Sequence, residues 1–89
     1  MIYIVSYDLK TPGRDYESLY EAIKGYSGWW HYLESTWIIK SDMSATDIAN
    51  ALHKKMDSND YLLIVDITNK DKDGWLPKKA WDWIRDNEK

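Results

Sequence analysis

The stretch WWHYLESTWIIK, residues 29–40, constrains the fold of this chain more than any other segment. It holds three of the six tryptophans, yet three polar residues, Glu34 to Thr36, lie in its middle. A single strand of this length would be unusual, because strands in globular proteins most often have about 5 to 6 residues. A tight hairpin places the polar residues at the bend. The pattern therefore predicts two strands, Trp30–Leu33 and Thr36–Lys40.

The segments on either side of this hairpin show the periodicity of strands and helices. MIYIVSYD and YLLIVDIT are rich in β-branched and aromatic residues, and they predict a first strand, Ile2–Tyr7, and a last strand, Tyr61–Ile67. Apolar residues at helical spacing predict one helix that begins near Asp15 and a second helix that Ser44 caps. The order is strand, helix, strand, strand, helix, strand, which is the split β-α-β pattern of ferredoxin-like domains.

Topological rules turn this order into a specific sheet. Short hairpins and right-handed crossovers favour a four-stranded antiparallel sheet with strand order 4-1-3-2 and both helices on one face. We therefore predict one α+β ferredoxin-like domain over residues 1–89, with a core over residues 1–68 and a loop and short Trp-rich helix over residues 69–89. Helices for only one side leave an open aromatic face, which predicts association into a homodimer.

Two pairs of tryptophans carry expectations of their own. Trp81 and Trp83 lie in the final helix, and helical residues two positions apart point in different directions. One of them is expected in the core and the other against Trp75 or in an interface. Trp29 and Trp30 are expected on opposite faces of the sheet, one against the helices and the other on the open face.

The composition narrows the classes of protein. The chain has no cysteine, which excludes disulfides and thiolate metal sites and fits a reducing cytoplasm. No apolar run approaches a membrane span, and the first residues carry no basic start or cleavage site, so neither a membrane anchor nor a signal peptide is expected. The net charge of −3 argues against broad binding of duplex nucleic acid. Contact with RNA, DNA or a nucleotide should therefore be local, or made through a metal ion.

The predicted topology brings carboxylates to one edge of the sheet. Asp8 ends the first strand, Glu34 lies in the hairpin bend, and Asp60 precedes the last strand. Such a cluster of oxygen ligands suits Mg²⁺ or Mn²⁺, and the ion can polarise a phosphate and activate water. The alternative is that Asp8 only ends its strand and that Glu34 and Asp60 are solvated turn residues.

Other polar residues near this edge are candidate contacts for a substrate. Ser35 and Thr36 lie in the bend, and Lys54 follows the second helix. Hydroxyls in a hairpin more often satisfy the backbone, which is the alternative for the first two. His31 is the candidate acid or base near the hairpin. A histidine between two aromatic residues is, however, usually structural.

Several segments resemble a known family. MIYIVSYDL resembles the opening strand of the CRISPR-associated protein 2 family, in which an aspartate follows an aromatic residue at the strand end, as Asp8 follows Tyr7. LESTWIIKSDMS is similar to the strand pair and second-helix start of that family, and the virulence-associated protein D group shares the fold. WWHYLESTW and GWLP…AWDW are similar to segments of small bacterial and phage proteins that carry the label SinR family. The resemblance covers roughly residues 1 to 68.

The resemblance implies a homodimer with Asp8 of each subunit near the two-fold axis. In some family members this pair supports metal-dependent cleavage of RNA or DNA, and in others the dimer only scaffolds nucleic acid. Two departures weaken the transfer of nuclease function: the arginine-rich start of the first helix is reduced to Arg14, and the segment GWLPKKAWDWIRDNEK replaces the family's last strand.

The sequence as a whole predicts a small dimeric protein related to nucleic acids or nucleotides. One prediction of its function is a weak metal-dependent endoribonuclease. The alternative prediction is a non-catalytic nucleotide-binding or protein-interaction module of a bacterial or phage defence or counter-defence system. The candidate site comprises Asp8 and His31 as catalytic groups, Asp8 as ligand of Mg²⁺ or Mn²⁺, and Tyr7, Arg14, Ser35, Thr36 and Lys54 as substrate contacts.

Overall fold

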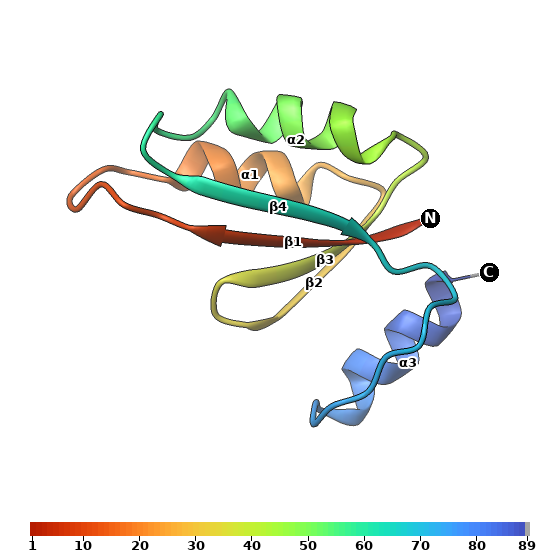
Figure 1. Cartoon of the computed structure of the whole chain (residues 1–89). Coiled ribbons are helices and arrows are strands. Elements are labelled where there is room, and N and C mark those ends of the chain that lie inside the picture. The colour runs from red at the N-terminus through yellow and green to blue at the C-terminus, as the bar shows by residue number, and fades with distance from the viewer. Residues whose placement is uncertain (89) are drawn as a thin grey trace.

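Four strands form one antiparallel sheet in the computed structural model, which describes residues 1–88 (Figure 1). The strand order is β2-β3-β1-β4, and each neighbouring pair is antiparallel. The predicted ferredoxin-like α+β fold is therefore confirmed, including the pairing of the last strand with the first. The elements in chain order are β1 (Ile2–Asp8), α1 (Glu17–Lys24), β2 (Gly28–Leu33), β3 (Thr36–Lys40), α2 (Ala45–His53), β4 (Tyr61–Asp66) and α3 (Lys78–Asn87).

The first two helices begin where local hydrogen bonds favour them. The Ser44 side chain accepts a hydrogen bond from the Asp47 backbone N–H at 3.1 Å, so the predicted cap of α2 is confirmed. The carboxylate of Asp15 accepts from the Glu17 N–H at 2.9 Å, and α1 begins at Glu17, two residues after Asp15. Within residues 1–88, no helix is long and apolar enough to cross a membrane.

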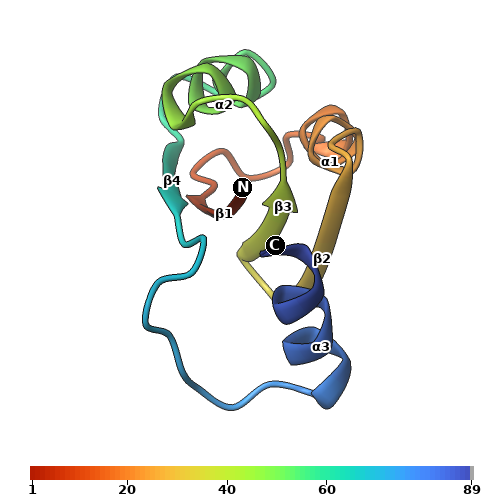
Figure 2. The same ribbon diagram turned by 90° about the vertical axis from the view of Figure 1, so that its right-hand side faces the viewer.

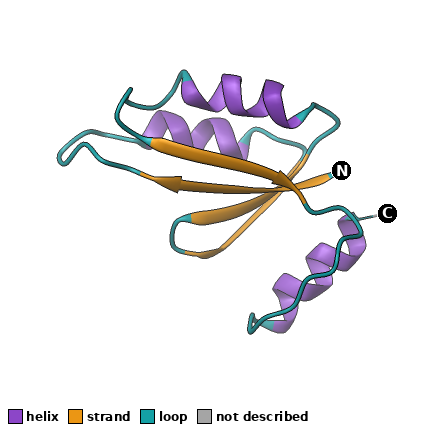
Figure 3. Ribbon diagram, in the orientation of Figure 1, coloured by secondary structure: helices purple, strands orange, loops and turns teal. Residues whose placement is uncertain are grey.

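Helices α1 and α2 lie side by side on one face of the sheet (Figures 1 and 3). Every second residue of β1 and β3 points toward them, as the pleat of a strand requires. The helices contribute apolar residues at a spacing of three or four positions, so each buries one stripe. The buried core between these layers contains Tyr3, Val5, Tyr16, Leu19, Ile23, Trp37, Ile39, Ile48, Leu52 and Met56.

The third helix packs on the opposite face of the sheet, as Figure 2 shows. Its buried residues Ala80 and Ile84 lie four positions apart and meet Ile2, Trp30 and Ile38. The prediction that helices cover only one side is therefore wrong. The reason is that the segment after β4 carries the chain across to the other face, where the apolar stripe of α3 finds a partner.

Neither Trp81 nor Trp83 lies in the fully buried core, so the prediction that one of them would is wrong. Both are half-buried and pack against the buried residues that α3 shares with the sheet. A Cβ atom on Gly28 would lie 3.3 Å from the Trp83 ring, which shows how closely α3 approaches the start of β2. The side chain of Glu88 ties the end of α3 to the preceding loop, through the Asn69 backbone N–H at 3.1 Å and an ion pair with Lys72.

The hairpin between β2 and β3 turns at Glu34 and Ser35, and it contains a β-bulge. Trp30 pairs with Ile38 and Leu33 with Thr36, so β2 advances one residue more than β3 over this interval. As predicted, the two adjacent tryptophans point to opposite faces: Trp29 lies with α1, and Trp30 lies with α3.

Candidate functional site

Aromatic rings line a cavity of about 470 Å³ at the outer edge of the sheet, on the α1 side. Strands β1, β2 and β3 contribute one wall, and α1 contributes the other. We call this the aromatic cavity. Its lining residues are Tyr7, Glu17, Tyr20, Lys24, Trp29, His31, Glu34 and Trp37.

His31 stacks on the ring of Trp37, with a centroid distance of 3.8 Å and an interplanar angle of 12°. The pairing of Trp30 with Ile38 brings the next residues of the two strands, His31 and Trp37, opposite each other, and the alternation of the strand places His31 on the same face as Trp29. His31 Nε2 lies 3.0 Å from the carbonyl oxygen of Glu34. A carbonyl only accepts, so Nε2 carries the hydrogen, and Nδ1 is the acceptor atom of the neutral ring.

Trp37 forms the floor of the aromatic cavity and is itself buried. Its Nε1 donates a hydrogen bond to the Tyr7 hydroxyl at 3.0 Å, and its ring lies 6.2 Å from that of Tyr20 at an angle of 21°. Burial raises the pKa of Tyr7, and the hydrogen bond from Trp37 offsets this only in part. The Tyr7 phenol is therefore neutral at pH 7, which leaves it able to donate a hydrogen bond.

Trp29 presents an exposed ring at this site, with 40% of its surface exposed. Its centroid lies 5.4 Å from that of Trp37, and Lys24 Nζ lies 5.6 Å from the centre of the Trp29 ring. Glu17 and Glu34 bring carboxylates to the same cavity. The site therefore offers a flat apolar surface, one ammonium group and two acceptors of hydrogen bonds.

Asp8 lies apart from the aromatic cavity, in a shallow pocket that Ser6 and Tyr61 also line. It is exposed and forms an ion pair with Lys10 at 2.7 Å. The hydrogen bond to Asp8 and the charge of Asp8 raise the pKa of Lys10, which stays protonated. Asp8 and His31, the two predicted catalytic groups, are therefore not brought together within one chain.

Asp60 has a structural role that the sequence did not reveal. It is 5% exposed, and its Oδ1 accepts from the Lys10 N–H at 2.7 Å and from the Tyr16 hydroxyl at 2.9 Å. Oδ2 accepts from the Asp57 N–H at 2.8 Å. Burial alone would raise the pKa of Asp60, but these hydrogen bonds and the charge of Arg14 outweigh it and lower the pKa.

The predicted cluster of three carboxylates does not form. Both oxygens of Asp60 are engaged by the backbone and by Tyr16, while Glu34 lies at the aromatic cavity. Across residues 1–88, no group of three or more histidine, aspartate or glutamate side chains is close enough together to hold a metal ion. Of the three predicted carboxylates, Asp60 is buried and Glu34 lines the aromatic cavity. Asp8 is exposed and lies outside that cavity.

The predicted substrate contacts are dispersed. Arg14 donates to the Lys55 carbonyl at 3.4 Å and lies 3.7 Å from Asp57, so it joins the loop before α1 to the end of α2. Lys54 follows α2 and is exposed. These basic side chains lie in a different part of the molecule from the aromatic cavity, which Tyr7 and His31 share.

The two hairpin residues Ser35 and Thr36 make different contacts. The carbonyl of Ser35 accepts from the Tyr7 N–H at 3.2 Å, which joins the turn to β1. The Thr36 hydroxyl lies 3.4 Å from that of Ser6, and Thr36 lines a pocket on the α3 side of the sheet. Neither hydroxyl lines the aromatic cavity.

Sequence reasoning missed the residues that build most of the aromatic cavity. Tyr20 and Lys24 lie four positions apart on α1, a spacing that places them on one face, and this signal was available. Trp29 and Trp37 were visible as aromatic residues of the hairpin. Their meeting with His31 depends on the register of β2 against β3, which the residue pattern did not indicate.

Fold and site together define a small ferredoxin-like α+β domain with a cavity lined by aromatic rings at one sheet edge. No family model matches the chain, and neither a curated protein nor a solved structure matches it. The resemblance to the CRISPR-associated protein 2 family therefore stays a prediction, as do the residue roles that come with it.

Proposed function

We propose that this protein is a binding module for a nucleotide or a short single-stranded nucleic acid, with the aromatic cavity as its site. The observation that carries this proposal is the group of rings at the edge of the sheet, where His31 stacks on Trp37 beside the exposed ring of Trp29. Stacking of one base on an aromatic side chain contributes about 1 to 3 kcal/mol.

The charges around the rings favour a small ligand. Lys24 lies over Trp29 and can turn to a phosphate, while Glu17 and Glu34 can accept hydrogen bonds from the exocyclic amino groups of a base. A long anionic strand would meet a chain of net charge −3, which opposes extended contact. A nucleotide or a few unpaired bases meets only the local groups.

Calorimetric titration with the four nucleoside monophosphates and with short single-stranded RNA and DNA tests this function. Trp29→Ala should weaken binding about tenfold or more, because the exposed stacking surface is lost. Trp75→Ala is the matched control, since Trp75 is an exposed tryptophan outside the aromatic cavity. Absence of binding, or equal weakening by both substitutions, would contradict the proposal.

A second candidate function is metal-dependent cleavage at Asp8. The observation in its favour is the exposed carboxylate at the end of β1, which has the position that the family resemblance gives to a ligand of Mg²⁺ or Mn²⁺. Purified protein should be incubated with RNA and DNA in Mg²⁺, Mn²⁺ or EDTA. We expect weak cleavage or none.

The variant Asp8→Asn separates the outcomes of that assay. Any cleavage that depends on the metal should disappear in this variant, while the fold is retained because the side chain is exposed. Cleavage that survives both EDTA and the substitution would exclude the metal mechanism and direct attention to His31.

We also propose that the protein acts as a homodimer in the cytoplasm. Tyr61, Leu63 and Val65 of the edge strand β4 are exposed, Leu63 to 60%. Apolar side chains on an uncovered strand commonly mark an association surface. The lack of cysteine fits a reducing compartment.

A further inference from the structure

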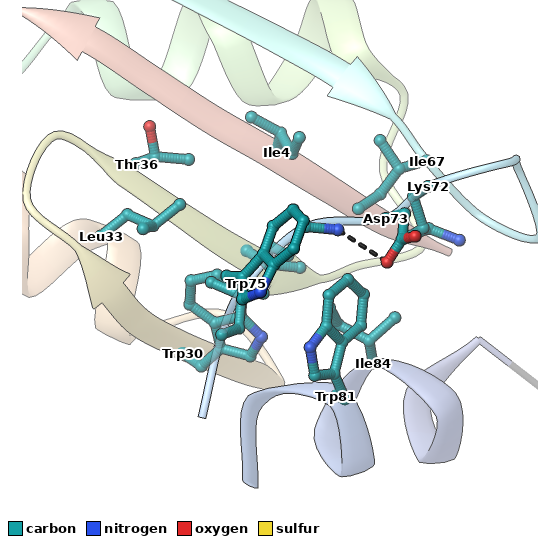
Figure 4. A pocket seen from close by; sticks show the side chains of 13 residues that line it. Ile4, Trp30, Leu33, Thr36, Ile67, Lys72, Asp73, Trp75, Trp81 and Ile84 are labelled. Atoms are coloured by element: carbon teal, nitrogen blue, oxygen red, sulfur yellow. Dashed lines mark hydrogen bonds between the residues drawn. The ribbon is translucent and has the colours of Figure 1, made fainter. Parts of the chain in front are cut away.

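A second pocket, of about 280 Å³, lies between the sheet and α3, on the face opposite α1 and α2. Figure 4 shows Ile4 and Leu33 on its sheet side, Trp81 and Ile84 on its α3 side, and Trp75 across the middle of the view. We call it the α3 pocket. It shares no lining residue with the aromatic cavity.

Trp30, which lines the α3 pocket, carries a hydrogen-bond donor without an acceptor. Trp30 is 4% exposed. Its Nε1 is buried and has no hydrogen-bond partner among residues 1–88. A buried N–H group without a partner costs about 1 to 3 kcal/mol, and such groups are uncommon in folded proteins. A ligand in the pocket whose acceptor reaches this N–H would remove the cost.

The side chain of Trp75 also has no surface to pack on among the described residues. Trp75 lines the α3 pocket, yet its side chain is 98% exposed. A large aromatic side chain that lies in water contributes no free energy of burial to the fold. Burial of the same side chain against a ligand would be favourable. An occupant of the pocket would give this ring a surface to pack on.

We propose that the α3 pocket binds a small, neutral, planar molecule that carries one hydrogen-bond acceptor, such as an aryl ketone or a heteroaromatic compound. The three tryptophans Trp30, Trp75 and Trp81 supply flat apolar surface for a ring. Trp30 Nε1 donates to the acceptor. This site is independent of the proposed nucleotide site.

The charge of the ligand follows from the groups at the pocket. Lys72 forms an ion pair with Glu88 and donates to the Lys70 carbonyl, so its ammonium group is already engaged. Asp73 adds a negative group at the same side. An anionic ligand would therefore lose its hydration without gaining a free cation, whereas a neutral acceptor needs only the indole N–H.

Acetophenone and α-methylstyrene provide a matched pair of probes, because the second replaces the carbonyl oxygen of the first with a methylene group. The indole N–H signals in a ¹H–¹⁵N NMR spectrum of the ¹⁵N-labelled full chain report binding at each of the six tryptophans. Acetophenone should move the Trp30 signal downfield in a saturable manner. Its affinity should exceed that of α-methylstyrene about tenfold, which corresponds to one hydrogen bond.

Trp30→Phe keeps an aromatic ring but removes the donor, so it should reduce the affinity ratio of the two probes to about one. Tyr26→Phe, which removes a hydroxyl from the other side of the sheet, should leave the ratio unchanged. The comparison of the two probes on the unmodified protein stands even if a variant does not fold.

Four results would overturn the proposal. The first three are equal affinities for the two probes in the unmodified protein, saturable shifts confined to other tryptophans, and a Trp30 signal that does not respond. A Trp30 signal that moves when the protein alone is diluted would assign the pocket to a second copy of the chain, and this result would also overturn it.

Discussion

Substitution of Asp60 by asparagine should destabilise the protein by about 2 to 4 kcal/mol at pH 7. Asparagine can keep the acceptor atom that serves the Lys10 N–H and the Tyr16 hydroxyl. Its amide group, however, would present a donor to the Asp57 N–H, which now donates to Oδ2 at 2.8 Å. The buried N–H of Asp57 would then lack a partner, and the remaining bonds would lose the help of the negative charge.

Urea denaturation and thermal melting measure this loss. For a domain of this size, each kcal/mol shifts Tm by about 4 to 8 °C, so the effect is well above experimental error. Asp42→Asn is the control, because Asp42 is an exposed carboxylate in a loop. The control should change stability by about 0.5 kcal/mol or less.

The pH dependence provides a second readout with a definite sign. Hydrogen bonds lower the pKa of Asp60 in the folded state below the value of about 3.9 expected in the unfolded chain. The stabilisation is therefore complete above about pH 4 and is lost as the pH falls through the lower folded-state pKa. The difference between the unmodified protein and Asp60→Asn should narrow over this acidic range.

Two outcomes would refute this reasoning. One is a stability difference between Asp60→Asn and Asp42→Asn that is close to zero at pH 7 or independent of pH. The other is stabilisation by Asp60→Asn, which is the result expected of a carboxylate held near other carboxylates as a metal ligand.

Three further predictions concern helices and association. Gly28→Ala should destabilise the packing of α3 by about 1 kcal/mol, because the new Cβ would lie 3.3 Å from the Trp83 ring. Amide hydrogen exchange should then accelerate in α3 more than in α1 and α2. Ser44→Ala should cost about 1 kcal/mol in urea denaturation through loss of the α2 cap, while Thr46→Ala should cost less. Leu63→Lys should convert the proposed dimer to a monomer in light scattering; an unmodified protein that stays monomeric well above micromolar concentration would refute the dimer.

The fold was predictable because its signals are local. Two apolar strands, a polar bend and the cap at Ser44 each depend on a few consecutive residues, and topological rules then leave few arrangements. The site was less predictable, because its features depend on distant partners. Asp60 becomes buried through Tyr16, which is far away in the sequence, and His31 meets Trp37 through the register of β2 against β3.

The position of α3 shows the same limit. Ala80 and Ile84 indicate an apolar stripe, but nothing in that stripe says which face of the sheet it covers. The path of the chain between β4 and α3 decides this, and no regular period describes it. The prediction of an open face therefore failed although the final helix was correctly expected.

The bulge in β2 adds one residue that the pairing on either side of it does not require. Deletion of one residue between Trp30 and Leu33 would restore regular pairing between the two strands of the hairpin. Trp29 would stay opposite Ile39 and at the aromatic cavity, and Trp30 would stay opposite Ile38 and at the α3 pocket. In an alignment of related chains, a gap of one residue in this segment would therefore be compatible with both pockets.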